Sequence, residues 1–391
     1  MPPKLGSASD AADPAAATPR HFAFIDSLRA LCALYVLLCH AWYEPANGYY
    51  AQRWLNKLGM SYGHLAVDVF IVISGFVIIL PIAARGDQVG SVTRFLKRRA
   101  RRILPPFYAA LLLTIAFILL FAHERTGTVW DNSLPLTWRA ALANFALIQN
   151  WVLRSPTALI SYQLWSIAVE WQIYLLVPIL VLAVSRLGYA LTCVLAIATS
   201  VALTVTHGEW GSVHHWFVAL FLFGAGAARL VVRAPKRAAS LGLPGLGILL
   251  VTCAVIVIKG NHWWGSWIPF LDLPIGAGSA LLIAALTSGA RSSSPVAWLA
   301  RALAWRPLVK LGAFSYSLYL VHPMLLHGAW LLWNRTRGSE PVGMYGLLLL
   351  SCPAIVAASW LFHLAFERPF MTAPSSSKSD AGRPAIVDRT A

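Results

Sequence analysis

The stretch FAFIDSLRALCALYVLLCHAWY, residues 22–43, decides the fold that we expect for the whole chain. It is long and apolar enough to cross a membrane as one helix, which takes roughly 20 residues. It nevertheless contains Asp26, Arg29 and His40, and ionisable groups inside hydrocarbon are costly unless they are partnered or used. Arg29 and His40 lie within about 20° of one helix face and about 16 Å apart along it. We therefore expect them to mark the two ends of one functional interior.

The composition is that of an integral membrane protein. Of the 391 residues, 58% are hydrophobic and only 12% are charged, whereas a soluble domain carries about twice that share of charge. The net charge is +16, but the basic residues lie between apolar segments, where they set topology and meet anionic headgroups. The lipid bilayer is therefore the expected partner, and we expect no binding of nucleic acid. The five cysteines all fall in apolar segments, which indicates small buried residues without a disulfide framework.

The apolar segments predict an all-α integral membrane protein, a bundle of about ten transmembrane helices. The expected spans are 22–43, 63–84, 105–122, 164–185, 187–206, 214–232, 243–259, 268–288, 309–333 and 343–366. With the N-terminus in the cytoplasm, 23 of the 31 Lys and Arg residues fall on the cytoplasmic side, as the positive-inside rule requires. Both termini are then cytoplasmic. Residues 21–370 form the expected transmembrane domain, and residues 1–20 and 371–391 are expected to be disordered cytoplasmic tails.

The strongest charge cluster, TRFLKRRARRILPPFY at residues 93–108, precedes the third span on the cytoplasmic side. Its simplest interpretation is a positive-inside stop signal or an amphipathic surface helix on anionic lipid. Guanidinium groups also clamp phosphates, so the cluster could instead hold a polyanionic cytosolic cofactor. Taken alone, the cluster favours the simpler interpretation.

Three other spans carry polar residues that an apolar helix does not need. Ser74 and Gly75 form a small-residue notch, which by itself favours close helix packing over ligand binding. Glu170 lies about a turn and a half inside its span and needs a partner, a proton or water, which favours a functional group over a structural ion pair. Tyr319 and His322 fall near one helix face, where a site role and a satisfied buried histidine are about equally favoured.

Two further features have no role that the sequence can assign. Asp68 enters the second span early, and Asp272 is a lone acidic residue near the outer end of its span. His207, His214 and His215 cluster outside the membrane, but no carboxylate or cysteine at ligand spacing supports a metal there. We therefore expect no metal.

Together these motifs resemble acyltransferase family 3, the membrane O-acyltransferases that modify bacterial surface sugars and some secondary metabolites. Each motif is weak alone, but the set follows the family's order over nearly the whole chain. The matching residues are Arg29 with His40, VDVFIVISGFVI at 67–78, FLKRRARRILPPFY at 95–108, LWSIAVEWQIYLL at 164–176, GAFSYSLYLVHP at 312–323 and ERPF at 367–370. The resemblance implies a ten-helix, multi-pass protein of the bacterial inner (cytoplasmic) membrane.

The chain departs from the family's pattern at two places. Trp171 follows Glu170 at a position that is often acidic in relatives, so a second carboxylate is missing. Many relatives also carry an extra helix and an esterase-like domain at the C-terminus, whereas this sequence stops shortly after ERPF. We therefore expect any such periplasmic partner enzyme to be a separate protein.

The resemblance implies transfer of an acyl group, by default acetyl, from cytoplasmic acyl-CoA to a hydroxyl of a carbohydrate or glycolipid acceptor. His40 would act as general base, because imidazole accepts a proton at neutral pH. Glu170 would orient it, and Tyr316, Tyr319 or His322 would donate to the developing oxyanion. The residues expected in catalysis are His40, Arg29, Glu170, Tyr319 and His322. Those expected to bind acyl-CoA are Arg98, Arg99, Arg101, Arg102 and Ser74.

Three alternatives stay open. Intramembrane His, Glu and Arg also build the proton relays of transporters, although transporters more often show internal repeats with paired broken helices, and the sequence has no convincing repeat. A membrane protein that senses acyl-CoA without turnover would keep nucleotide binding and form no product. Within the enzyme hypothesis, a covalent acyl-histidine intermediate is also open.

Overall fold

The computed structural model describes residues 22–43, 61–88, 90–152, 160–206, 213–289, 295–337 and 341–371. All regular secondary structure in these ranges is helical, which confirms the predicted all-α class. The tails predicted over 1–20 and 371–391 lie outside the described residues, except for Met371.

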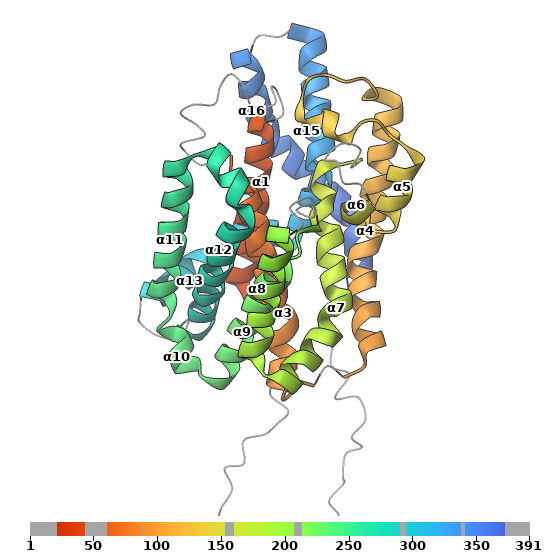
Figure 1. Cartoon of the computed structure of the whole chain (residues 1–391). Helices are drawn as coiled ribbons and strands as arrows, with labels where there is room; N and C mark the ends of the chain where they lie inside the picture. The colour runs from red at the N-terminus through yellow and green to blue at the C-terminus, as the bar shows by residue number, and fades with distance from the viewer. Residues whose placement is uncertain are drawn as a thin grey trace, which may run out of the picture.

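The long helices form an upright bundle in which α15 and α16 reach highest in Figure 1. Their bounds are α1 Ala23–Tyr43, α3 His64–Ala84, α4 Val92–Phe121, α7 Trp165–Leu187, α8 Tyr189–Thr206, α9 Phe217–Arg233, α11 Gly242–Lys259, α12 Asn261–Gly289, α15 Ser315–Arg337 and α16 Pro341–Phe362. The short elements are η2 Val129–Ser133, α5 Trp138–Phe145, α6 Gln149–Val152, η3 Tyr162–Leu164, α10 Pro235–Ala239, α13 Pro295–Leu303, α14 Arg306–Ala313, η5 His363–Glu367 and η6 Arg368–Phe370.

Within the described ranges, eight helical segments are long and apolar enough to cross a membrane. Helices α9 and α15 occupy two of the expected spans but are not among these eight. The expected count of ten and the cytoplasmic placement of both termini therefore stay predictions. The bundle carries apolar side chains on its outside, such as Ile258 at 81% and Leu350 at 78% exposure. Exposed apolar surface on this scale is typical of a protein that contacts lipid.

Two expected spans have different bounds in the structure. Helix α4 starts at Val92, so the basic cluster and the span after it form one helix that includes Pro105 and Pro106. A proline removes one backbone hydrogen bond but has a φ compatible with a helix, so the helix continues past the pair. The expected span 309–333 is divided at Phe314 between α14 and α15. Gly312 lets α14 approach α1 closely, because a Cβ there would lie only 2.0 Å from the backbone oxygen of Asp26.

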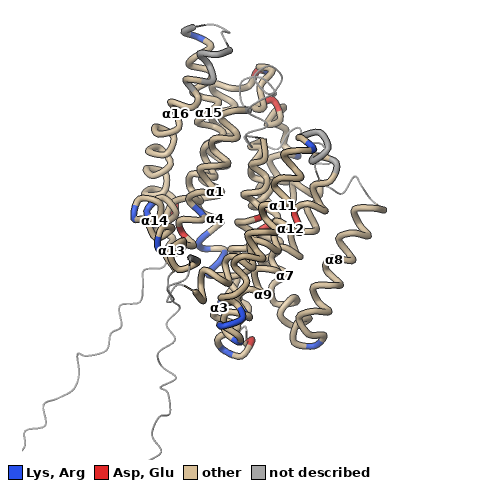
Figure 2. The backbone as a smooth tube through the Cα atoms, turned by 90° about the vertical axis from the view of Figure 1, so that its left-hand side faces the viewer, with Lys and Arg blue, Asp and Glu red and all other residues tan. Residues whose placement is uncertain are grey.

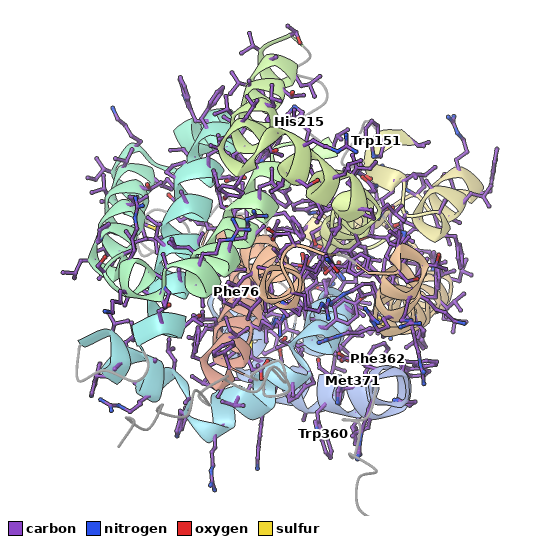
Figure 3. All side chains as sticks on the ribbon, turned by 90° about the horizontal axis from the view of Figure 1, so that it is seen from below. Phe76, Trp151, His215, Trp360, Phe362 and Met371 are labelled. Carbon is purple, nitrogen blue, oxygen red and sulfur yellow. The ribbon has the colours of Figure 1, made fainter. Side chains whose placement is uncertain are left out.

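Helix α3 packs most extensively against α9 and also contacts α12 and α1. The two backbones meet at glycines: a Cβ on Gly75 would lie 2.1 Å from the Phe221 oxygen, and one on Gly224 would lie 2.0 Å from the Val72 oxygen. The Gly75 half of the predicted notch is therefore used for helix packing. Phe76, next along the chain, is fully buried and lies inside the bundle in Figure 3, whereas Trp360 lies near its edge.

Lys and Arg residues gather mainly in the lower half of the molecule. Figure 2 shows most of the blue segments around α13 and α14 and near the lower ends of α3 and α9. This uneven distribution agrees with the charge asymmetry that the sequence predicts for a protein with a cytoplasmic and an outer side.

Candidate functional site

The structure brings His40 of α1 and His322 of α15 together as a hydrogen-bonded pair. His40 Nδ1 lies 2.7 Å from His322 Nε2. The ring planes differ by only 10° and the ring centroids are 5.0 Å apart. That centroid separation is nearly the largest that a 2.7 Å contact between ring nitrogens allows. The rings therefore lie end to end, and the hydrogen bond runs in their planes.

The hydrogen bonds of His322 define which nitrogen of His40 can accept a proton. The backbone carbonyl of Leu318 can only accept, so His322 Nδ1 donates to it over 3.1 Å. With both rings neutral, His322 Nε2 is then an acceptor and His40 Nδ1 must be the donor. The lone pair of His40 is left on Nε2. This is the arrangement that a general base needs, because an imidazole oriented through Nδ1 presents Nε2 to its substrate.

A pocket lies between α1, α3, α4, α7, α14 and α15, and it encloses about 930 Å³ of space when its open part is included. Its polar lining combines three arginines, two carboxylates and several hydroxyl groups. The polar residues that line it are Arg29, Ser74, Arg99, Arg102, Ser166, Glu170, Tyr174, Ser315, Tyr316, Tyr319 and Glu367. An apolar pocket with a few converging polar groups is the usual form of a small-molecule site.

The predicted acyl-CoA-binding arginines divide into two groups. Arg99 and Arg102 line the pocket together with Arg29 of α1. Arg98 and Arg101 are exposed and are not part of this lining. The Arg99 guanidinium lies 5.8 Å from the centre of the Tyr174 ring, which faces the same cavity. Arg102 is exposed as well, and on α4 it lies between Arg98 and Arg99, so its contact with the pocket is decided by the packing and not by the helical period alone.

A chain of hydrogen bonds connects Glu170, Tyr174 and Ser74 across one wall of the pocket. The Tyr174 hydroxyl donates to Glu170 Oε1 over 2.5 Å. Because its only proton is used there, the Ser74 hydroxyl donates to Tyr174 over 2.7 Å. Ser74 thus lines the pocket while Gly75 beside it packs against α9. Glu170 accepts a hydrogen bond from Tyr174, and His40 Nδ1 donates to His322, so orientation of His40 by Glu170 stays a prediction.

Tyr319 connects the pocket to the histidine pair. It lines the pocket, and its ring centroid is 5.8 Å from that of His322, about one helical turn further along α15. Its hydroxyl is hydrogen bonded to Ser166 Oγ at 2.7 Å and donates to the Gln163 backbone oxygen at 3.3 Å. The pocket near Arg29 and the histidine pair are therefore neighbouring parts of one interior.

Other predicted groups have partners that the sequence did not identify. Tyr316 donates to the backbone oxygen of Ile103 over 3.0 Å, which ties α15 to α4. Glu367 of the ERPF motif is buried and accepts hydrogen bonds from Ser317 at 2.5 Å and from His363 at 2.8 Å. The spacing of four residues between His363 and Glu367 is the signal that could have suggested this pair.

Two residues with partners near these groups, Gln163 and His64, were not predicted from the sequence. Gln163 is buried and donates to the backbone oxygen of Leu320, which lies between the two candidate catalytic residues of α15. His64 lies 2.7 Å from Asp272, and one turn before Asp68 in the sequence. The spacing of four residues could have suggested that His64 lies near Asp68. No pattern in the sequence could have suggested Asp272, because it is 208 positions away.

Comparison with known proteins identifies the family. A family model described as an acyltransferase domain matches residues 22–364. The chain belongs to this acyltransferase family. It is 27% identical over 330 residues to the Bacillus subtilis (strain 168) protein named "Putative peptidoglycan O-acetyltransferase YrhL", a match that covers 78% of this chain and 48% of that protein. The resemblance that the motifs indicated is thereby confirmed.

Two further relatives differ in how much of them the chain covers. O-acetyltransferase OatA of Staphylococcus aureus is 24% identical over 374 residues, covering 88% of this chain and 57% of OatA. Acyltransferase MdmB of Streptomyces mycarofaciens is 25% identical over 387 residues, covering 89% of this chain and 91% of MdmB. The chain thus spans about half the length of YrhL and OatA but nearly all of MdmB. No solved structure matches.

Proposed function

We propose that this membrane protein transfers an acyl group, acetyl in the simplest case, from acyl-CoA to a hydroxyl of a carbohydrate or glycolipid acceptor. The observation that carries the proposal is the His40–His322 pair, whose geometry leaves a proton acceptor on His40 Nε2 beside an arginine-lined pocket. The family assignment supports acyl transfer, and two of the relatives are named for transfer of acetyl groups to oxygen.

The arginines suit the donor. Acyl-CoA carries several phosphate charges, and guanidinium groups bind phosphate through paired, charge-assisted hydrogen bonds. Arg99 and Arg102 face the pocket from α4, and Arg29 faces it from α1. In our proposal these three hold the phosphates on the cytoplasmic side. The pantetheine arm then runs along α1 for the roughly 16 Å that separates Arg29 from His40.

In the proposed reaction His40 Nε2 removes the proton of the acceptor hydroxyl. The oxygen attacks the thioester carbonyl, a C–O bond forms, the C–S bond breaks, and the thiolate of CoA leaves and takes up the proton from His40. His322 stabilises the imidazolium through its hydrogen bond, and the Tyr319 hydroxyl exchanges its hydrogen bond to Gln163 for one to the developing oxyanion. Glu170 and Ser74 shape the pocket wall along which the acyl group passes.

The names of the relatives and the charge distribution support the proposed acceptor and location. YrhL is named for peptidoglycan, and MdmB is named only as an acyltransferase. A carbohydrate acceptor outside the bacterial cytoplasmic membrane, with the basic side of the bundle in the cytoplasm, agrees with the gathering of Lys and Arg in Figure 2. A periplasmic partner enzyme, if the pathway uses one, would receive or redirect the product.

The test uses inside-out vesicles that contain the full chain and acetyl-CoA labelled in the acetyl group. Covalent label in a glycan or lipid fraction, absent from vesicles with His40→Ala, supports the proposal. Label that accumulates as unchanged acetyl-CoA or free acetate would support transport instead. Transfer at the wild-type rate by His40→Ala, at equal protein abundance, would rule out the proposed base.

A further inference from the structure

A second cluster of ionisable side chains lies away from the pocket, where α3 meets α12. His64 Nε2 is 2.7 Å from Asp272 Oδ2 and 3.6 Å from Asp68 Oδ1. One possible ligand atom from each of the three side chains lies within 4.8 Å of the others. None of the three lines the pocket that contains Arg29. The cluster is therefore separate from the groups proposed for acyl transfer.

The charges of this cluster do not balance. Asp68 and Asp272 are both 0% exposed. Both oxygens of Asp68 and Oδ1 of Asp272 have no hydrogen-bond partner among the described residues. A buried carboxylate without a donor is strongly unfavourable unless it is neutralised or coordinates a metal. His64 can neutralise one carboxylate at most, so either a proton or a bound cation must supply the second positive charge.

The donor set and its spacing favour a cation. An imidazole nitrogen with two carboxylate oxygens suits zinc and similar transition metals, whereas Mg²⁺ and Ca²⁺ prefer oxygen ligands alone. Ligands on a tetrahedral ion with bonds of about 2.0 Å lie about 3.3 Å apart. The separation of 3.6 Å from His64 Nε2 to Asp68 Oδ1 is close to that value, whereas the 2.7 Å to Asp272 Oδ2 is a direct hydrogen bond that a bound ion would replace.

The surroundings also have the form of a metal site. Trp216 donates its indole N–H to Asp272 Oδ2 over 2.8 Å, an outer contact of the kind that orients metal-binding carboxylates. This bond leaves Asp272 Oδ1 available. The Trp165 ring stacks on His64 at 5.7 Å and on His214 at 3.9 Å, which covers the histidine with aromatic surface.

We propose that His64, Asp68 and Asp272 bind one divalent transition-metal ion of the zinc type, which joins α3 to α12. The sequence predicted no metal because the three ligands come from two segments about 200 residues apart, and because His64 was not recognised. Three protein ligands leave a further coordination position for water or a substrate oxygen.

The primary experiment measures metal in the full chain, purified in detergent and passed over a chelating resin, by inductively coupled plasma mass spectrometry. We expect about one zinc ion per chain, because the three ligands form a single site. Asp68→Asn and Asp272→Asn should each reduce the content at least about tenfold, since neutral amides are poor ligands for zinc. Asp87→Asn is the matched control: Asp87 follows α3 at its other end, pairs with Arg229 at 2.9 Å, and should keep the metal.

Two further measurements keep the test decisive if the asparagine variants fold poorly. In the wild-type protein, Co²⁺ should produce the visible absorption of a four-coordinate site, and His64→Cys should add a thiolate-to-metal band without losing the ion. Trp216→Phe, which keeps an aromatic side chain but loses the indole N–H, should weaken zinc binding about tenfold.

The proposal is overturned if the wild-type protein holds no transition metal and its melting temperature does not rise with added Zn²⁺, Mn²⁺ or Co²⁺. It is equally overturned if Asp68→Asn and Asp87→Asn bind the same amount of zinc, because the ion is then adventitious. In either case the two aspartates share a proton. These readouts do not involve acyl transfer, so failure of one proposal leaves the other standing.

Discussion

The His40–His322 pair and the His64–Asp68–Asp272 cluster are both partly buried and each joins two helices through a histidine, yet their polar groups find partners in different ways. In the pair, both hydrogen bonds have a donor and an acceptor. His40 Nδ1 donates to His322 Nε2, and His322 Nδ1 donates to the Leu318 carbonyl. In the cluster, three carboxylate oxygens have no donor among the described residues. The first grouping can be neutral and ready to accept a proton, whereas the second needs a positive charge from outside the chain.

The largest effect expected is at His40. His40→Ala should lower kcat for acyl transfer by about 10²–10⁴-fold, the usual contribution of a positioned general base. Bound zinc should not change, because His40 is not part of the second cluster. Steady-state transfer assays at matched membrane abundance measure the first quantity, and elemental analysis measures the second. Loss of both activity and metal would mean that the two groupings are one site.

His322 should have a smaller effect, because it acts through His40. His322→Phe removes the acceptor of the 2.7 Å hydrogen bond and leaves a buried donor unpaired, which costs about 1–3 kcal/mol. We expect kcat to fall about ten- to hundredfold while KM for acyl-CoA stays unchanged. His322→Gln, which can still accept a hydrogen bond, should restore part of the rate. Equal rates for the two variants would exclude a role for that hydrogen bond.

Arg102 and Arg101 test the division of the basic cluster, since one lines the pocket and the other does not. Arg102→Glu should raise KM for acyl-CoA about tenfold or more through loss of a charge-assisted contact. Arg101→Glu should change it less than about twofold, as expected for an exposed charge that does not line the pocket. Equal increases would indicate that the cluster serves only topology and lipid contact.

The smallest effect concerns α3, the helix that carries His64 and Asp68 and also contributes Ser74 to the pocket. Gly75→Ala places a methyl group 2.1 Å from the Phe221 oxygen, so α3 must move from α9 at a cost of about 1–3 kcal/mol. We expect a melting temperature lower by a few degrees and weaker zinc binding, with little change in KM for acyl-CoA. Gly247→Ala is the control, because a Cβ there meets no atom within 4 Å. Equal melting temperatures for the two variants would contradict the close contact.

Several site residues could be recognised from sequence because the chemistry was visible along a single helix. Arg29 and His40 are costly residues at a helical spacing, and the structure places Arg29 at the pocket and His40 at the histidine pair. Glu170 and Tyr174 are one turn apart on α7 and are hydrogen bonded to each other. Their roles in the reaction stay predictions. The partner of His40 could not be predicted, because His322 is 282 positions away and no local pattern connects them.

The sequence by itself determined the helical class, the membrane environment and the family, because hydrophobicity, charge asymmetry and ordered motifs are properties of the chain that do not depend on packing. The tertiary structure decided which arginines face the pocket, which nitrogen of His40 is available, and how two apparently unrelated aspartates meet one histidine. Contacts between distant segments depend on how helices cross, and those crossings are set by small residues such as Gly75 and Gly312, where two backbones touch.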